Sequence, residues 1–385
     1  MASSSKDDGF TCSSSNLGNP PPSKKQKETD IEETLDRLSE LPDPLLVQIL
    51  SLLRTKDAFR TFILSKRWHY LWTFACNFNF NRRNYIGGMT EEFASFIDYV
   101  LHHSVSSKIK KFALNCTHPD RYYSSEGGHV VHDSQICRWL TFAVEKNVEA
   151  VELYSNVEDG CCTLPESFCA CSSLISLVFS SCCLGPDIVV SWKSLKSIHL
   201  EFLGLWDEHI VNLLSGCPAL ETMELYCVWE FSRLDIRSSK LKRLKLKNYT
   251  LLDDGRDHSL EIIAPYLQHL EISGELYDLK CRLVDVSSLV SAKLTFNIIC
   301  IKDVFAINAE EFDDAEDSCG DYHQVFRNLV QDYLQKLSCA TEVTMGSWFT
   351  EVLCMLQFKG VPVPEWKCKY LALELHMKKF NLYGK

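Results

Sequence analysis

Short pairs of alternating apolar residues recur along most of this 385-residue chain, and their spacing limits the possible folds more than any other feature. Alternation of apolar and polar residues indicates a strand with one buried face. From Leu153 to Phe296, the second members of successive pairs lie 26, 21, 25, 21, 26 and 24 residues apart. This regularity predicts a repeat protein in which each unit adds one strand. The pairs are Phe112/Leu114, Val151/Leu153, Leu177/Phe179, Ile198/Leu200, Met223/Leu225, Leu244/Leu246, Leu270/Ile272 and Leu294/Phe296.

A single unit of this kind cannot bury its own apolar residues, so the units must stack on one another. Each unit then contributes one short parallel strand and a return segment. Intervals of about 20 to 29 residues are those of leucine-rich repeats. Several units also fit the pattern LxxLxL, for example from Leu220 to Leu225. We therefore predict an α/β fold in which an irregular leucine-rich-repeat solenoid with a curved parallel sheet occupies residues 82–385.

Outside the strands, the sequence predicts few full helices. One is expected from Trp206 to Leu214, and another over residues 322–338. The period breaks after Phe296, so the repeats are expected to be irregular beyond residue 300, with two further units near residues 342–345 and 370–375.

A different pattern occupies residues 35–81, where three short amphipathic helices are predicted. The second is expected to begin at a cap provided by the Thr55 hydroxyl, and the third at a cap provided by Ser65. Three helices this short cannot enclose all their apolar side chains, so we expect another protein to cover part of them. The second helix is expected to carry Ala58, Phe59, Phe62 and Ile63 inward. The first has one apolar face with Leu41, Leu45, Ile49 and Leu53, and the third has one apolar stripe with Trp68, Leu71 and Trp72.

These helices resemble the plant F-box over nearly the whole of that motif. Phe59 and Phe62 depart from the family pattern, which usually has smaller residues there, and Arg54 stands where proline is common. The repeats over most of residues 108–300 are similar to the degenerate leucine-rich repeats that follow the F-box in a large plant family. Members often continue into a region called the FBD domain, which we expect to be incomplete here. The matching segments are Asp36–Asp43, Leu45-Leu46, Ile49-Leu50, Thr55–Ala58, Leu64–Trp68 and Leu71-Trp72.

The resemblance implies a substrate-recognition subunit of an SCF-type ubiquitin ligase that is not itself an enzyme. In such a complex the F-box binds a Skp-type adaptor and through it a cullin, and the repeats hold a protein target. For any one F-box residue, a place in the helix core is the alternative interpretation. The residues expected to face the adaptor, or to support the surface that does, are Leu41, Pro42, Leu45, Leu46, Ile49, Leu50, Leu64, Trp68 and Leu71.

Target contacts are expected from strand residues that alternate with the buried positions. These side chains point away from the buried side of the sheet, and a solvated polar face is the alternative interpretation. They are His199, Glu201, Glu224, Tyr226, Lys245, Lys247, Glu271 and Ser273.

Composition excludes several other classes of protein. The formal net charge of −11 argues against a nucleic-acid partner, which would require a basic face. No apolar run is long enough for a membrane helix, and the N-terminus lacks the apolar segment of a signal peptide, so we expect the protein in the cytoplasm or the nucleus. Residues 1–34 have the composition of a disordered tail. Within it, residues 24–27 could be a weak nuclear-import signal or a solvated stretch.

Neither a cofactor nor a metal is expected. The 18 cysteines lack the spacing of zinc sites and are expected to be reduced. The acidic stretch 308–321 lacks the order of a calcium loop. No catalytic motif such as GxSxG or HExxH occurs, and His129, His132 and Asp133 have unspecific spacing. The alternative hypotheses are a small-molecule sensor, an F-box protein acting outside a ligase, and an enzyme with an unrecognised site.

Overall fold

The computed structural model describes residues 38, 40–84, 90–117, 131–155, 164–182, 188–249, 259–277, 280–299, 322–360 and 368–374. The chain divides into two compact units, Met1–Pro42 and Asp43–Lys385, and all described helices and strands belong to the second. Three segments considered above lie outside the described residues: the predicted tail, the acidic stretch 308–321, and the residues beyond 374, where an FBD region was considered.

The second unit begins with three helices, as predicted, and we call residues Asp43–Phe74 the helical module. Thr55 does not cap its helix: its Oγ1 accepts a hydrogen bond from the backbone N–H of Asn79 at 2.6 Å. The Ser65 cap is also wrong, because the third helix begins at Trp68 and has no side-chain cap. The elements of the module are α1 (Asp43–Leu52), α2 (Thr55–Arg60), η1 (Thr61–Ile63), α3 (Trp68–Leu71) and η2 (Trp72–Phe74).

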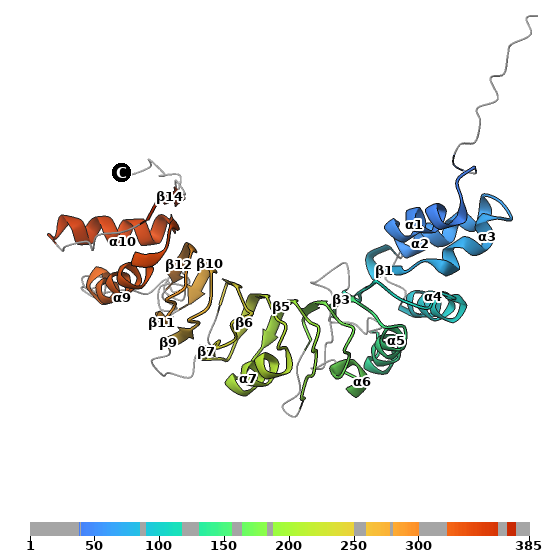
Figure 1. Ribbon diagram of the computed structural model, residues 1–385, viewed down its shortest axis with the longest axis horizontal. Helices are drawn as coiled ribbons and strands as arrows, with labels where there is room; N and C mark the ends of the chain where they lie inside the picture. The colour runs from blue at the N-terminus through green and yellow to red at the C-terminus, as the bar shows by residue number, and fades with distance from the viewer. Residues whose placement is uncertain are drawn as a thin grey trace, which may run out of the picture. The chain divides into compact units, whose positions relative to one another are not determined.

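Eleven strands form one open parallel sheet in the order β1-β2-β3-β4-β5-β6-β8-β10-β12-β13-β14, and they follow an arc (Figure 1). The predicted parallel sheet is therefore present. Its first strand lies within the range 35–81 and is followed by η3 (Arg82–Asn84). The strands are β1 (Asn77–Asn81), β2 (Lys111–Asn115), β3 (Ala150–Tyr154), β4 (Ser176–Ser180), β5 (Ser197–Gly204), β6 (Thr222–Trp229), β8 (Arg243–Lys247), β10 (His269–Tyr277), β12 (Ser291–Ile299), β13 (Glu342–Gly346) and β14 (Tyr370–Glu374).

The predicted apolar pairs stack in register and are buried from Phe112/Leu114 through Leu270/Ile272. The last predicted pair is wrong by two residues, because Ala292 and Leu294 align with Leu270 and Ile272. Phe296 is nevertheless buried, since β12 continues the same alternation to Ile299. The two further units are present as β13 and β14.

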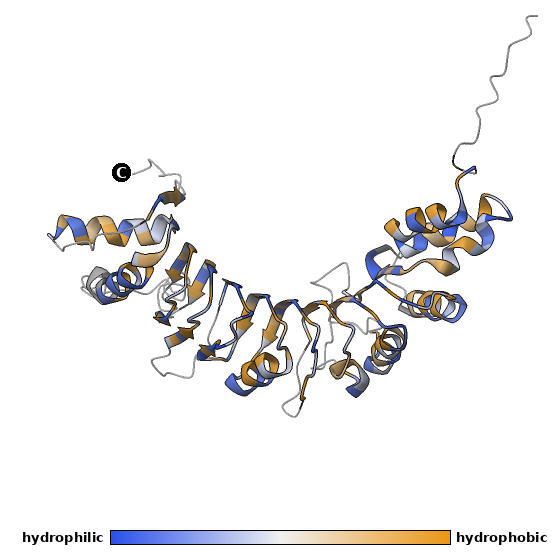
Figure 2. Ribbon diagram, viewed as in Figure 1, coloured by the Kyte–Doolittle hydropathy of each residue, from blue (hydrophilic) through white to orange (hydrophobic). Residues whose placement is uncertain are grey.

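Helices cover the side of the sheet toward which the buried pairs point (Figure 1). Figure 2 shows hydrophobic and hydrophilic residues on opposite sides of several of them, as expected for amphipathic helices. The predicted helix near Trp206 is present as α7, but the expectation of few others was wrong, since α4 and α5 have 14 and 13 residues. These helices are α4 (Thr90–His103), α5 (Asp133–Glu145), α6 (Glu166–Cys169) and α7 (Asp207–Gly216).

A second sheet of three parallel strands lies in the C-terminal half of the solenoid and was not predicted. Its order is β11-β9-β7. Helix α9 packs on it, and the Tyr333 hydroxyl donates a hydrogen bond to the Cys281 carbonyl at 2.7 Å. Helix α9 confirms the helix predicted over residues 322–338. The elements are β7 (Arg233–Asp235), β9 (Ser259–Ile263), β11 (Lys280–Asp285), α9 (Tyr322–Lys336), η5 (Leu337–Cys339) and α10 (Ser347–Phe358). Among the described helices, none has the length and apolar character needed to cross a bilayer.

Candidate functional site

The helical module buries four of the nine residues predicted to serve an adaptor. Leu46 and Leu50 on α1 are fully buried, and Trp68 and Leu71 on α3 are nearly so. These side chains fill the interior between the helices. Any contribution they make to binding is through the surface that they support.

The other predicted residues reach the surface. Leu64 is 61% exposed and Leu45 is 45% exposed, whereas Ile49 is half-buried. In the first unit, Leu41 is half-buried and Pro42 is exposed. Adaptor contact by these residues stays a prediction.

Sequence reasoning missed other exposed apolar side chains of the module. Ile63, which was expected to face inward, is 74% exposed, and Leu52, Tyr70 and Phe74 are also exposed. A signal for this was present, because adjacent residues on a helix point about 100° apart. An adjacent apolar pair such as Ile63-Leu64 therefore needs a wide apolar face to be buried at both positions, and here both side chains are exposed. Exposed apolar side chains concentrated on a small module are typical of a protein-binding surface.

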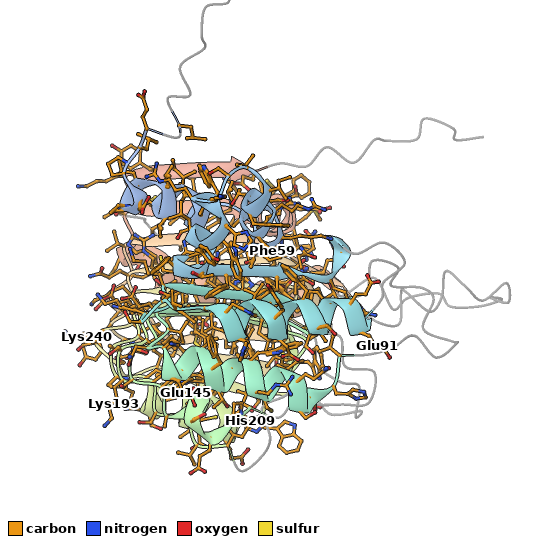
Figure 3. The ribbon with its side chains drawn as sticks, turned by 90° about the vertical axis from the view of Figure 1, so that its right-hand side faces the viewer. Phe59, Glu91, Glu145, Lys193, His209 and Lys240 are labelled. Carbon is orange, nitrogen blue, oxygen red and sulfur yellow. The ribbon has the colours of Figure 1, made fainter. Side chains whose placement is uncertain are left out.

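Aromatic side chains join the helical module to α4, the first helix of the solenoid. The Phe59 ring lies 5.6 Å from Phe96 and 5.8 Å from Tyr99, both on α4. It also lies 5.2 Å from Trp72, which stacks on Tyr99 at 6.3 Å. Figure 3 shows Phe59 between the helices of the module and the first strands. With the bond from Asn79 to Thr55, these contacts pack the module directly on the solenoid.

The side of the sheet away from the helices carries the first, third and fifth residues of each strand, and we call it the open face. All eight residues predicted as target contacts line one cavity on it, with a volume of about 440 Å³. They come from four neighbouring strands, β5, β6, β8 and β10. The structure thus brings the eight together, and their role as target contacts stays a prediction.

An ion-pair chain neutralises the centre of this cavity. The Glu224 carboxylate lies 3.2 Å from His199 Nδ1 and 2.9 Å from Lys245 Nζ. Burial acts to raise the pKa of Glu224, but the hydrogen bonds from Lys245 and His199 outweigh it and hold that pKa below its usual value. The hydrogen bond to Glu224 raises the pKa of Lys245. At neutral pH, Glu224 and Lys245 are therefore both charged and satisfy each other.

Lys247 differs from Lys245 because, within the described ranges, no carboxylate lies close enough to form an ion pair with it. Its Nζ lies 4.9 Å from the centre of the Tyr226 ring, which is a cation–π distance. The ammonium group is exposed on this strand and open to an anionic partner.

Strands β5 and β6 depart from extended backbone just past the cavity, at the residue after the fifth position. Phe202 (φ 53°) and Cys227 (φ 46°) have left-handed backbones, and the ladder between β5 and β6 resumes at Leu203 and Val228. Bulky residues rarely adopt this conformation. The left-handed residue in each strand keeps Leu203 and Val228 buried, while Phe202 is half-buried and its ring centre lies 5.5 Å from that of Tyr226.

The described cysteines are free thiols. Burial raises the pKa of Cys217 to about 12, and burial raises that of Cys281 to about 12 as well, so neither thiol is reactive at neutral pH. Among the residues that the structure describes, no three His, Cys, Asp or Glu side chains are grouped as a metal site requires.

Comparison with protein families gives two matches. The F-box domain matches residues 38–78, which end within β1. The leucine-rich repeats of the FBD-associated F-box protein At5g56370 match residues 136–295. These two ranges contain the helical module and the strands that line the cavity.

Curated plant proteins are similar to the chain over most of its length. F-box/LRR-repeat protein At3g03360 of Arabidopsis thaliana is 29% identical over 92% of this chain and 68% of its own length. F-box/LRR-repeat protein At5g02910 from the same plant is 32% identical over 90% of this chain and 67% of its own. Putative F-box protein At1g49610, also from that plant, is 30% identical over 91% of this chain and 80% of its own.

Proposed function

Since the chain belongs to the plant F-box/LRR-repeat family, we propose that it is the substrate-recognition subunit of an SCF-type ubiquitin ligase in the cytoplasm or nucleus. F-box domains generally bind Skp-type adaptors, leucine-rich repeats bind targets, and proteins of this family are typically non-catalytic adaptors. In this proposal, the helical module binds a Skp-type adaptor and through it a cullin. The solenoid holds the protein to be ubiquitinated.

The observation that carries the proposal is the set of exposed apolar side chains on the helical module. Leu45, Ile63 and Leu64 expose a large part of their surface on a segment that matches the F-box domain. Burying a side chain of this type fully contributes about 1.5–3 kcal/mol. A partner that covers several of them therefore gains free energy that offsets part of the cost of association.

The proposed mechanism is proximity rather than catalysis by this chain. Packing of Phe59 against Tyr99 fixes the module to the solenoid, so a target held by the repeats stays at a constrained position relative to the adaptor. Constraining two reactants in this way raises their effective concentration. In this mechanism, the conjugating enzyme supplied by the partners carries out the transfer.

The cavity favours a protein target over a small metabolite. Its volume of about 440 Å³ falls within the usual range for small ligands, but most of its lining side chains are charged. Small-molecule pockets are lined mainly by apolar and aromatic side chains. Among the described residues, this lining has one tyrosine, Tyr226, one apolar residue, Leu225, and no tryptophan or phenylalanine.

Co-purification with a Skp-type adaptor tests the proposal. Buried residues such as Leu46 are poor choices for substitution, because their loss would destabilise the module and confound the binding result. The informative variant is Leu45→Asp with Leu64→Asp, which places two charges on the exposed surface. Val211→Asp on α7 is the matched control, since Val211 is 63% exposed and lies outside the module.

We expect the wild type and the control to form a stoichiometric complex with the adaptor. The double variant should lose the complex while it keeps the melting temperature of the wild type. Retention of the complex by the double variant would contradict the proposed surface. Absence of a complex for the folded wild type with any adaptor would refute the ligase role and leave an F-box protein that acts in another way.

A further inference from the structure

The open face is hollowed a second time toward the C-terminal strands, next to the first cavity. A second cavity of about 500 Å³ is lined by residues that directly follow those of the first: Asn248 follows Lys247, and Gly274 follows Ser273. It extends over Thr295 of β12. The two cavities together cross six neighbouring strands, β5, β6, β8, β10, β12 and β13. We call this surface the fifth-residue groove, because the fifth residues of these strands lie along it.

The length of the groove suits an extended peptide. Neighbouring strands lie about 4.8 Å apart, so the five intervals span about 24 Å. An extended chain advances about 3.4 Å per residue, so about seven residues of peptide would fill this length.

The lining provides polar groups for part of an extended backbone, and solvent at the open side of the groove can pair with the rest. Every N–H and C=O of a bound peptide must find a partner once water is displaced. The hydroxyls of Ser273 and Thr295 are available for this, since neither forms a side-chain hydrogen bond with any residue in the described part of the chain. A hydroxyl both donates and accepts, so it can pair with either backbone group.

The charges along the groove have a fixed order. Glu201 lies on β5, and its nearest ionisable partner is His199 Nε2 at 3.9 Å. Lys247 lies two strands further along, on β8, with its ammonium group above the Tyr226 ring. Lys245 is neutralised by Glu224 and so contributes little net charge. Among the fifth residues of the strands, the Glu201 carboxylate and the Lys247 ammonium thus remain for a ligand, about 10 Å apart by strand spacing, which corresponds to about three residues of extended chain. Glu271, at the third position of β10, is a further carboxylate of the lining.

We propose that the fifth-residue groove binds an extended segment of the target protein, with an acidic side chain at Lys247 and a basic side chain about three residues away at Glu201. The Tyr226 ring provides an apolar contact for the residue beside the acidic one. This inference rests on the proposed function, since it specifies how the solenoid recognises its target.

Selection from a random heptapeptide library displayed on phage, with the purified full-length chain as bait, tests the inference. We expect the wild type to enrich peptides with Asp or Glu about three positions from Lys or Arg. Lys247→Glu should lose the acidic preference, and Glu201→Lys should lose the basic one. Lys240→Glu is the matched control, because Lys240 is exposed and lies at the edge of the molecule outside the groove (Figure 3).

An enriched peptide carrying a fluorophore then gives affinities by anisotropy. We expect Lys247→Glu to weaken binding at least tenfold and the Lys240→Glu control to leave it unchanged. Enrichment of no peptide, enrichment without acidic residues, or equal binding by Lys247→Glu and the wild type would each overturn the inference.

Adaptor binding by the same preparations separates this inference from the proposed function. A chain that binds the adaptor but selects no peptide would refute the groove and leave the ligase role standing. A chain that selects the expected peptides but binds no adaptor would refute the ligase role and support the groove.

Discussion

The contact between Phe59 and Tyr99 gives the sharpest test of how the helical module is attached to the solenoid. Their rings meet edge to face, with centroids 5.8 Å apart and planes at 83°. A pair of this geometry contributes about 0.5–1.5 kcal/mol beyond its buried area. Phe59→Leu keeps most of the apolar volume but removes ring contacts with Trp72 and Phe96 as well. We therefore expect it to lower the free energy of unfolding by about 2 kcal/mol.

A double-mutant cycle isolates the pair. The free energy of unfolding is measured by urea titration for the wild type, Phe59→Leu, Tyr99→Leu and the double variant, and we expect a coupling of about 1 kcal/mol. Phe59→Leu with Phe231→Leu is the control pair, because Phe231 lies in the solenoid and packs on Tyr249, so the two effects should add. A coupling of zero for Phe59 and Tyr99 would refute direct packing of the module on α4 and, with it, the fixed geometry that the proximity mechanism needs.

Three further predictions concern single sites. Leu46→Ala should lower the free energy of unfolding by about 2–5 kcal/mol, measured by urea titration, because its side chain is fully buried. Lys245→Met should raise the pKa of Glu224, which an NMR titration measures. In the wild type the pKa of Glu224 is lowered by folding, so its ionised carboxylate stabilises the protein above the unfolded-state pKa. This stability is lost as the pH falls through the folded-state pKa. Gly274→Ala should lower the melting temperature, since its φ of 80° disfavours a side chain and the new Cβ would overlap the Asn248 amide.

The repeat was predictable from sequence because each buried pair is local and recurs. The register between neighbouring strands was harder to predict where the alternation of buried and exposed residues extends beyond one pair. In β12, Ala292, Leu294 and Phe296 are all buried on the same side of the sheet, so the spacing alone could not decide which two belong to the repeat. Pairing with β10 decides it, because Leu294 lies opposite Ile272. That is a tertiary contact, and no local pattern contains it.

The missed elements fall into two kinds. Helix α4 carried a readable signal, since Phe93, Ile97 and Val100 recur at helical spacing and are buried. The second sheet did not, because Leu260 and Ile262 of β9 alternate like the strands of the main sheet. A period of two residues reports one buried face and leaves open which sheet the strand joins.

The candidate site was predictable to a different degree on each surface. Alternation was enough to select Lys247 and its neighbours, because a strand has only two faces and the apolar residues mark one of them. In the helical module, apolar residues of the interior and of the exposed surface are neighbours on the same helix: Leu45 and Leu46 are adjacent, and only Leu46 is buried. Which of them faces inward depends on how α1 packs on α3, so the sequence could not separate the interior from the binding surface.

The two surfaces differ in physical kind, and this difference matches the roles proposed for them. The module exposes apolar side chains such as Leu64, and apolar burial is strong but not directional. It suits one constant partner. The fifth-residue groove instead presents Glu201 and Lys247 with hydroxyls beyond them, and a charge left unpaired there weakens binding of a wrong sequence. Substitutions in the groove should therefore change which target is bound, whereas substitutions in the module should remove every target from the ligase together.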